Sequence, residues 1–243
     1  MPDRVAIVTN VNDYAGRPAA EALAGDGFIV LCHDPSFTSM AEREKFDRPE
    51  ARVEAAEAQS PEDLVDEAVR RFGTLDAVVS NDSYPAKRAR IEEGVAEDFR
   101  ATLDALMVWP FRLLGAAARV MKPRRQGRIV MLTSASPLHP YPGFSMYASA
   151  RAGASVLAQA AARELAPHGI VVNAVAPNFL YSETYYPRAQ WEQDPKYVQR
   201  LKEMVPMQRL GRPAEIGALI AFLVSGKSDF VSGQVIPFTG GWP

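Results

Sequence analysis

Three side chains in the second half of the chain could together remove a proton from an alcohol: Ser134, Tyr147 and Arg151. A phenol has a reference pKa of about 10 and is a poor base at neutral pH. A fixed positive charge beside it favours the phenolate, and a guanidinium stays charged at any working pH. Because a serine hydroxyl can hold the alcohol while the phenol takes its proton, the set predicts general base catalysis on a hydroxyl group.

The spacing of these residues indicates how they could meet. Tyr147 and Arg151 are four residues apart within 146–167, a stretch with a helical pattern, so their side chains share one helix face. Ser134 ends the apolar run 127–134, which is typical of a buried strand. The end of a parallel strand and the start of the next helix open onto the same sheet edge. A Tyr–Arg pair alone is more often a surface contact, and only this placement favours catalysis.

Short apolar runs alternate with longer amphipathic stretches along the whole chain. Near-continuous apolar strands separated by helices predict a parallel sheet with helices on both faces. No composition break divides the sequence, so we expect one Rossmann-like, three-layer α/β domain over 1–243 with about seven strands. We expect strands at 4–9, 28–33, 52–56, 75–80, 127–134, 170–175 and 234–238, and helices at 17–26, 40–46, 61–72, 97–122 (bent at Pro110), 146–167 and 213–225.

The composition is that of a soluble globular protein, with 243 residues, 47% hydrophobic, 23% charged and a net charge of −2. It offers no broad basic face for nucleic acid and no apolar run of about 18 residues that could span a membrane. The single Cys32 and three scattered histidines predict neither a disulfide nor a metal site. The sequence enters the first strand with no signal peptide ahead of it, so we expect a cytoplasmic protein.

The turn after the first strand, 10–16, lacks most of the glycines that a dinucleotide site needs. In such a site the pyrophosphate approaches bare backbone at the N-terminus of the next helix. Here only Gly16 remains, and Asn10 and Tyr14 stand where glycines are expected. We therefore expect the Tyr14 ring to fill the volume of a cofactor, no cofactor to bind, and Asp34 to be a turn residue or a remnant. A degenerate but working cofactor loop is the alternative.

These features together resemble the halohydrin dehalogenases, an offshoot of the short-chain dehydrogenase/reductases, over essentially the whole chain. The Ser134–Tyr147 pair is common to all reductases of that superfamily. The blocked first turn and Arg151, in place of the usual Lys, are much more specific, and Ala105 stands near the usual Asn. Further matches are Thr9-Asn10-Val11 with Tyr14, Cys32-His33-Asp34, Ser80-Asn81-Asp82, Pro177-Asn178-Phe179-Leu180, Gln208-Arg209-Leu210-Gly211 and Gly240-Gly241.

The resemblance implies an elimination that needs no cofactor. Ser134 and Tyr147 would hold the hydroxyl of a vicinal haloalcohol, and Tyr147, with its pKa lowered by Arg151, would take the proton. The alkoxide would expel the halide and leave an epoxide, which azide, cyanide, nitrite or halide would open in the reverse direction. The halide would lie in the place of nicotinamide, with backbone N–H groups of Phe179 and Leu180 as an anion nest. The residues expected there are Tyr14, Pro177, Asn178, Phe179 and Leu180.

The segment 177–195 is too long for a simple connection and predicts an ordered loop over the site. The resemblance also implies a homotetramer through the alanine-rich helix 146–167, although packing on its own sheet is the alternative. Trp242 could reach a neighbouring subunit or anchor its own terminus. The residues that we expect to border the substrate pocket, or otherwise to pack in surface loops, are Asn12, Tyr84, Pro85, Leu138, Tyr141, Pro142, Tyr185, Tyr186 and Trp191.

Three classes of function remain open from the sequence. The first is a lyase that interconverts small haloalcohols and epoxides, and the second is an NAD(P)-dependent oxidoreductase with an atypical cofactor loop. The third is a catalytically silent protein that senses small molecules or holds a partner. Retention of Ser134, Tyr147 and Arg151 disfavours the third class.

Overall fold

A seven-stranded parallel sheet forms the centre of the computed structural model, which describes residues 3–183 and 185–243. The strands follow the order β3-β2-β1-β4-β5-β6-β7, and each neighbouring pair is parallel. This confirms the predicted single α/β domain. The strands are β1 (Arg4–Val8), β2 (Phe28–Cys32), β3 (Val53–Ala55), β4 (Ala77–Ser80), β5 (Gly127–Leu132), β6 (Ile170–Pro177) and β7 (Val235–Phe238).

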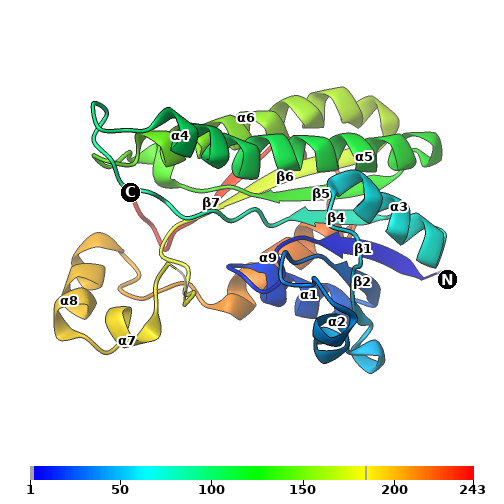
Figure 1. The fold of residues 1–243 in the computed structure, drawn as a ribbon, viewed down its shortest axis with the longest axis horizontal. Helices are drawn as coiled ribbons and strands as arrows, with labels where there is room; N and C mark the ends of the chain where they lie inside the picture. The colour runs from blue at the N-terminus through cyan, green and yellow to red at the C-terminus, as the bar shows by residue number, and fades with distance from the viewer. Residues whose placement is uncertain (1–2, 184) are drawn as a thin grey trace.

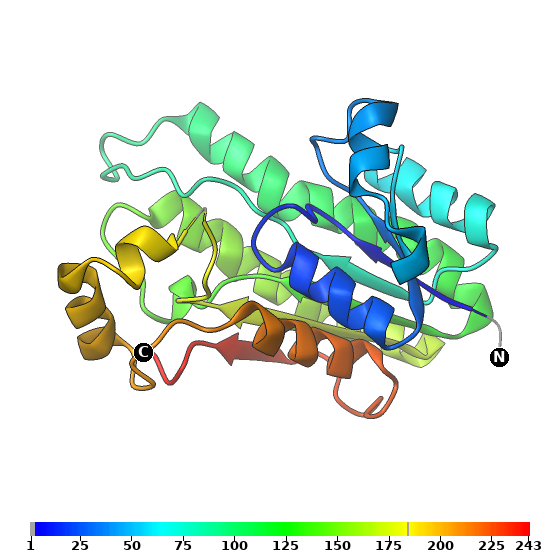
Figure 2. The same ribbon diagram turned by 90° about the horizontal axis from the view of Figure 1, so that it is seen from below.

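Helices cover both faces of the sheet, as the apolar strands require (Figure 1). One face packs against α3 (Pro61–Phe72), α5 (Trp109–Arg124) and α6 (Ser145–Leu165), and its core includes Ile7 and Leu64. Seen from below, α1 (Gly16–Gly25) and α9 (Pro213–Val224) lie side by side on the other face (Figure 2). The shorter helices are α2 (Met40–Phe46), η1 (Pro49–Ala51), η3 (Ser136–Leu138) and η4 (Ala166–His168).

The strand order reverses at β1, which pairs with β2 on one side and β4 on the other. Ligands of such sheets bind at the carboxyl ends of the strands beside this reversal. Asn81, directly after β4, ties the two loops there together: its Nδ2 donates to the carbonyls of Asn10 and Asp13, both at 2.9 Å. Asn10 Nδ2 donates back to the Asn81 carbonyl at 2.9 Å. The loops at this edge are therefore fixed to each other.

The expected helix 97–122 is divided into three parts. The α-helix α4 (Ala96–Leu103) passes into a π-helical segment, η2 (Asp104–Val108), before α5 begins. Pro110 lies in the first turn of α5 and has no N–H to donate to the preceding turn. The irregularity therefore comes just before the proline, as a wider helical turn rather than a simple bend.

The stretch after β6 is more structured than we expected. It contains α7 (Arg188–Trp191), and α8 (Pro195–Met204) follows it where we expected no helix. The side chain of Asp194 accepts the Lys196 N–H at 2.9 Å, so Asp194 caps α8 and Pro195 takes the first helical position. In Figure 1 these two helices form a small lobe beyond the carboxyl ends of the strands.

Residues 3–183 and 185–243 were searched for a membrane-spanning helix and for a metal site. No helix among them is long and apolar enough to cross a membrane. No group of three or more His, Cys, Asp or Glu side chains among them could hold a metal ion.

Candidate active site

A cavity of about 680 Å³ opens at the carboxyl edge of the sheet and is lined by both Ser134 and Tyr147. Ser134 follows β5 by two residues, and Tyr147 lies in the first turn of α6. The Ser134 hydroxyl accepts the N–H of Ser136 and lies 3.1 Å from the Ser136 hydroxyl, so its position is fixed. The structure thus brings the two predicted hydroxyl groups to one cavity.

Arg151 lies behind Tyr147 and is 1% exposed. Its Nη1 donates to the Leu132 carbonyl at 3.0 Å and its Nη2 to the Asp82 carbonyl at 2.8 Å. The guanidinium carbon is 5.2 Å from the centre of the Tyr147 ring. The fork of the guanidinium is therefore bound at both ends, and its charge sits beside the phenol without entering the cavity.

Asp82, whose carbonyl accepts a hydrogen bond from Arg151, is itself 2% exposed. Its Oδ2 accepts the Ser80 hydroxyl at 2.6 Å. Burial raises the pKa of Asp82 to about 6, while the Ser80 hydrogen bond and the positive charge of Arg151 act against the rise. Asp82 is thus tied to Arg151 through its backbone carbonyl, and its buried side chain interacts electrostatically with the guanidinium.

The first turn does not fit a dinucleotide, because its backbone donors are already in use. The Asn12 N–H donates to Asp34 at 2.9 Å, and the Tyr14 N–H donates to the side chain of Asp13 at 2.7 Å. The Gly16 N–H donates to the Asp13 carbonyl at 3.0 Å. A pyrophosphate would have to displace two carboxylates from the groups that normally bind it.

The side chains of the turn also occupy the space. The Tyr14 ring packs against Tyr185, with centres 5.3 Å apart and planes at 72°. Burial raises the pKa of Tyr14 well above its ordinary value, and the phenols of Tyr147 and Tyr186 add to the rise. Tyr14 and Asn10 have φ of +50° and +45°, the left-handed region in which glycine is usual. The backbone of this turn therefore keeps the conformation that glycines usually adopt, although Tyr14 places an aromatic ring there.

The segment after β6 differs in part from the expected anion nest. The Phe179 N–H donates to Asn178 Oδ1 at 3.0 Å, and that oxygen also accepts the Tyr186 hydroxyl at 2.5 Å. The prediction that the Phe179 N–H is free for an anion is therefore wrong. The Leu180 N–H has no hydrogen-bond partner among residues 3–183 and 185–243, although Leu180 is only 1% exposed. A buried N–H without a partner is costly unless a ligand accepts it.

Most of the other predicted residues do line the cavity. These are Tyr14, Pro85, Tyr141, Pro142, Pro177, Asn178, Phe179, Tyr185, Tyr186 and Trp191.

Four predicted residues lie outside the cavity wall. Asn12 is exposed and faces away, with its Nδ2 3.2 Å from the Ser36 hydroxyl. Leu138 is 55% exposed on η3, and Leu180 is packed in the core under α9. Tyr84 contributes only its carbonyl, which accepts the Tyr185 hydroxyl at 3.2 Å. Asn12, Leu138 and the Tyr84 side chain were therefore wrong as pocket residues.

Sequence reasoning missed part of the wall. Arg88 and Phe144 form one side of it, and Tyr197, Arg200 and Met204 come from α8. The signal that could have found the second group was Asp194-Pro195 followed by an amphipathic stretch, a usual helix start.

Trp242 packs within its own chain and is 6% exposed. Its ring lies 5.8 Å from that of Phe179, 6.2 Å from that of Tyr141 and 5.9 Å from that of His139. It therefore anchors the C-terminal segment beside the cavity, which was the second of the two roles expected for it.

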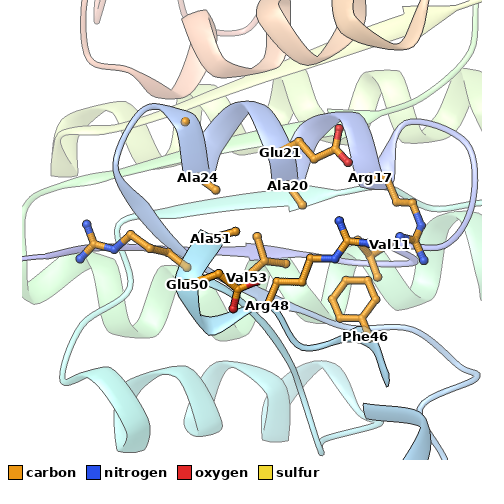
Figure 3. Close-up of a pocket in the computed structure, with 12 residues that line it drawn as sticks. Val11, Arg17, Ala20, Glu21, Ala24, Phe46, Arg48, Glu50, Ala51 and Val53 are labelled. Carbon is orange, nitrogen blue, oxygen red and sulfur yellow. The ribbon is translucent and has the colours of Figure 1, made fainter. Parts of the chain in front are cut away.

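A second cavity of about 370 Å³ lies between α1 and the segment that leads into β3 (Figure 3). Small apolar side chains form its floor, and charges of both signs line it: Arg17 and Arg48, Glu21 and Glu50. The Arg17 guanidinium lies 5.4 Å from the centre of the Phe46 ring. No serine, threonine or tyrosine is among its lining residues in the described chain, so the hydroxyl chemistry belongs to the cavity at Ser134.

Comparison with known proteins agrees with this geometry. Residues 15–243 match the family model described as enoyl-(acyl carrier protein) reductase. A 3-oxoacyl-[acyl-carrier-protein] reductase of Staphylococcus epidermidis is 29% identical over 248 residues, which cover 98% of each chain. The fold is thus that of the short-chain dehydrogenase/reductase class.

Two solved structures are more similar. A halohydrin dehalogenase bound to ethyl (2S)-oxiran-2-ylacetate is 40% identical with a TM-score of 0.95, covering 98% of this chain and 97% of that one. A structure described as a dehalogenation enzyme is 38% identical with a TM-score of 0.94, covering 100% and 99%. This chain belongs to the halohydrin dehalogenase family, a branch of the same class.

Proposed function

We propose that this protein converts vicinal haloalcohols to epoxides, with release of halide and a proton, and catalyses the reverse ring opening by small anions. The proposal rests on a difference between two segments at the same edge of the sheet. Ser134 and Tyr147 share a cavity with Arg151 behind them, while carboxylates and an aromatic ring occupy the first turn. The related halohydrin dehalogenase holds an epoxide ester, the product class that this reaction would give.

In the proposed reaction Ser134 donates a hydrogen bond to the substrate hydroxyl, and Tyr147 as phenolate takes the hydroxyl proton. The Arg151 charge favours that phenolate. The alkoxide oxygen forms a bond to the neighbouring carbon as the carbon–halogen bond breaks, and the halide leaves with the bonding electrons. Oxygen, carbon and halide must be nearly in line, so positioning by the cavity supplies much of the rate. Tyr147 then passes the proton to solvent.

The leaving halide would lie between the first turn and the segment after β6. Among residues 3–183 and 185–243 the buried Leu180 N–H has no hydrogen-bond partner, and the preceding residue, Phe179, lines the cavity together with Tyr14. Phe179 has a φ of +54°, an unusual backbone for an aromatic residue and one that anion-binding turns use. Asn178 would complete the site through its side-chain amide.

No nucleotide takes part in the proposed reaction, because the first turn does not fit one. We also propose that the protein is cytoplasmic and assembles as a homotetramer, with the alanine-rich helix α6 in an interface. Val156 on α6 and Phe111 on α5 are 61% and 62% exposed, which is consistent with a covered position in an assembly.

The test is incubation of the purified protein with 1,3-dichloro-2-propanol in weak buffer and without nucleotide. We expect equal amounts of chloride, acid and epoxide, measured by ion chromatography, pH-stat and gas chromatography. Calorimetric titration with NADH and NADPH should show no saturable binding. Saturable nucleotide binding with carbonyl reduction and no halide release would instead favour the NAD(P)-dependent oxidoreductase.

A further inference from the structure

The active-site cavity is lined by positive charge on residues that are exposed to solvent and so lie at its mouth. Two arginines, Arg88 and Arg200, line the cavity, and no Asp or Glu is among its lining residues in the described chain. Arg88 comes from the segment after β4 and Arg200 from α8, so the two cations reach the cavity from different elements. Two independent parts of the chain thus place the same charge at one opening.

Arg88 differs from the cations on either side of it. Lys87 pairs with Asp98 at 2.6 Å and Arg90 with Glu92 at 3.8 Å. Arg88 has no carboxylate partner among the described residues, and its guanidinium lies 4.6 Å from the centre of the Phe144 ring. Phe144 precedes Tyr147 by three residues and lines the same cavity, so this contact holds the Arg88 charge at the cavity wall.

Arg200 is likewise without a carboxylate partner among the described residues. Its Nε lies 3.4 Å from the sulfur of Met204, and the nearby Glu203 accepts a hydrogen bond from Gln199 at 2.9 Å. The Arg200 charge acts on the phenol of Tyr186, another lining residue, and lowers its pKa against the larger effect of burial. Arg200 and Tyr186 thus line the same cavity and interact electrostatically.

The cavity is also larger than a three-carbon haloalcohol needs. A volume of about 680 Å³ lies in the range that holds drug-sized ligands. Arg151 is buried and does not line the cavity, so the charge of Arg88 and Arg200 is a separate feature. Guanidinium groups suit planar oxyanions, which they can bind through two parallel hydrogen bonds.

We infer that Arg88 and Arg200 recognise a carboxylate on the substrate, so that this enzyme prefers haloalcohols and epoxides that carry a carboxylic acid over their neutral esters. This inference rests on the proposed function and names its substrate class. The carboxylate takes no part in the bond changes; it orients the hydroxyl and halide toward Ser134 and Tyr147. The effect acts on binding, so it appears in KM more than in kcat.

The experiment compares each acid with its methyl ester: 4-chloro-3-hydroxybutanoate and 6-chloro-5-hydroxyhexanoate, in halide-free buffer at constant ionic strength. For the wild type we expect the higher kcat/KM with the acid in at least one pair. R88Q and R200Q should each lower the acid-to-ester ratio about two- to fivefold, and the double variant about tenfold. The loss should lie in the KM of the acid.

Matched controls are R90Q and K202Q, which remove exposed charges from the same two segments outside the cavity wall. They should leave the ratio unchanged. If the double variant turns over the esters and keeps the wild-type acid-to-ester ratio of kcat/KM, the inference is wrong and the proposed function stays intact. An increase in the KM for azide alone would also overturn it, by assigning the arginines to the nucleophile. No halide release from any haloalcohol would overturn the proposed function itself.

Discussion

The first turn and the β5–α6 segment lie at the same edge of the sheet, but they differ in what they keep of the short-chain dehydrogenase/reductase class. At β5–α6 the chain keeps a hydroxyl, a phenol and a cation in one arrangement, with Arg151 bound at both ends of its guanidinium. At the first turn the backbone shape of a nucleotide loop persists, but its N–H groups bond to Asp13 and Asp34.

The difference shows how one fold can change its reaction. Proton transfer from a hydroxyl needs only the β5–α6 groups, whereas hydride transfer needs a nucleotide in the first turn. In this protein Tyr14 fills that turn and packs against Tyr185, and in the proposed reaction the leaving anion would lie beside it. Substitutions can test the two regions separately.

Tyr147→Phe should have the largest effect, because it removes the proton acceptor and keeps the ring. We expect kcat for halide release to fall about 10²–10⁴-fold, as for the loss of a general base. Steady-state chloride release measures it. Tyr185→Phe, which removes another phenol from the same cavity, should stay within about tenfold of the wild type. Near-full activity of Tyr147→Phe would mean that another group is the base.

Arg151→Lys should lower kcat at least about tenfold, and Arg151→Met further. An ammonium cannot donate to the Leu132 and Asp82 carbonyls through one planar fork, and a buried lysine loses its proton more readily than arginine. The measurement is the pH profile of halide release, whose acidic limb, where the base must lose its proton, should shift to higher pH. Arg163→Lys, on the exposed side of the same helix, is the matched control. Identical profiles for wild type and Arg151→Lys would contradict the assigned role.

Gly16→Ala should destabilise the first turn without touching the catalytic groups. An added Cβ would lie 2.6 Å from the Val11 Cα and 2.7 Å from the Asn10 carbonyl oxygen. Overpacking against backbone costs about 1–3 kcal/mol, or roughly 2–4 °C in Tm per kcal/mol for a chain of this size.

Gly25→Ala is the control for that prediction, because it lies in the same helix with nothing within 4 Å of its added Cβ. It should leave the free energy of unfolding unchanged or raise it by up to about 1 kcal/mol. Calorimetric melting of both variants decides the comparison. Equal Tm values would show that Gly16 is not retained for close packing.

His33, directly after β2, should give the smallest effect. It tests the surroundings of the first turn through the pH dependence of stability. Burial lowers its pKa to about 4, from an ordinary 6.5, while the charge of Asp34 acts against the change. The unfolded chain therefore binds a proton between about pH 6.5 and 4 that the folded chain does not. The stability that neutral His33 contributes is full above about pH 6.5 and is lost as pH falls toward 4.

His33→Phe should remove that loss, because phenylalanine keeps a ring beside Trp109 and does not titrate. We expect the difference in unfolding free energy between wild type and variant to change by on the order of 1 kcal/mol between pH 7 and pH 5. Urea unfolding at the two pH values measures it, with His168→Gln as the control. A pH-independent difference would contradict the buried, neutral state of His33.

Much of the site could be predicted because its parts are local. Tyr147 and Arg151 are four residues apart, so on a helix they share one face, and both lie on α6 as expected. The blocked turn also followed from residue types, since Tyr14 replaces a residue without a side chain. Asn12 could not be placed, because its side chain turns toward Ser36 and Arg17 rather than toward the neighbouring cavity.

The wall from α8 could not be predicted for another reason. Only Leu201 of this helix is buried, so the apolar pattern is weak and the helix depends on its cap at Asp194. Which of its side chains face the cavity depends on how the small lobe packs over the strand ends. Arg200 is therefore visible as a lining residue only in three dimensions.

The sequence alone determined the alternation of strands and helices, the candidate catalytic groups and the side chains that stand in the first turn, because each follows from residue type and short-range periodicity. The tertiary structure decided which N–H groups remain available, which charges have partners and which side chains share a cavity. Those properties depend on contacts between residues far apart in the chain, such as Asn81 with Asn10 and Arg151 with Asp82. Such contacts leave no local pattern in the sequence.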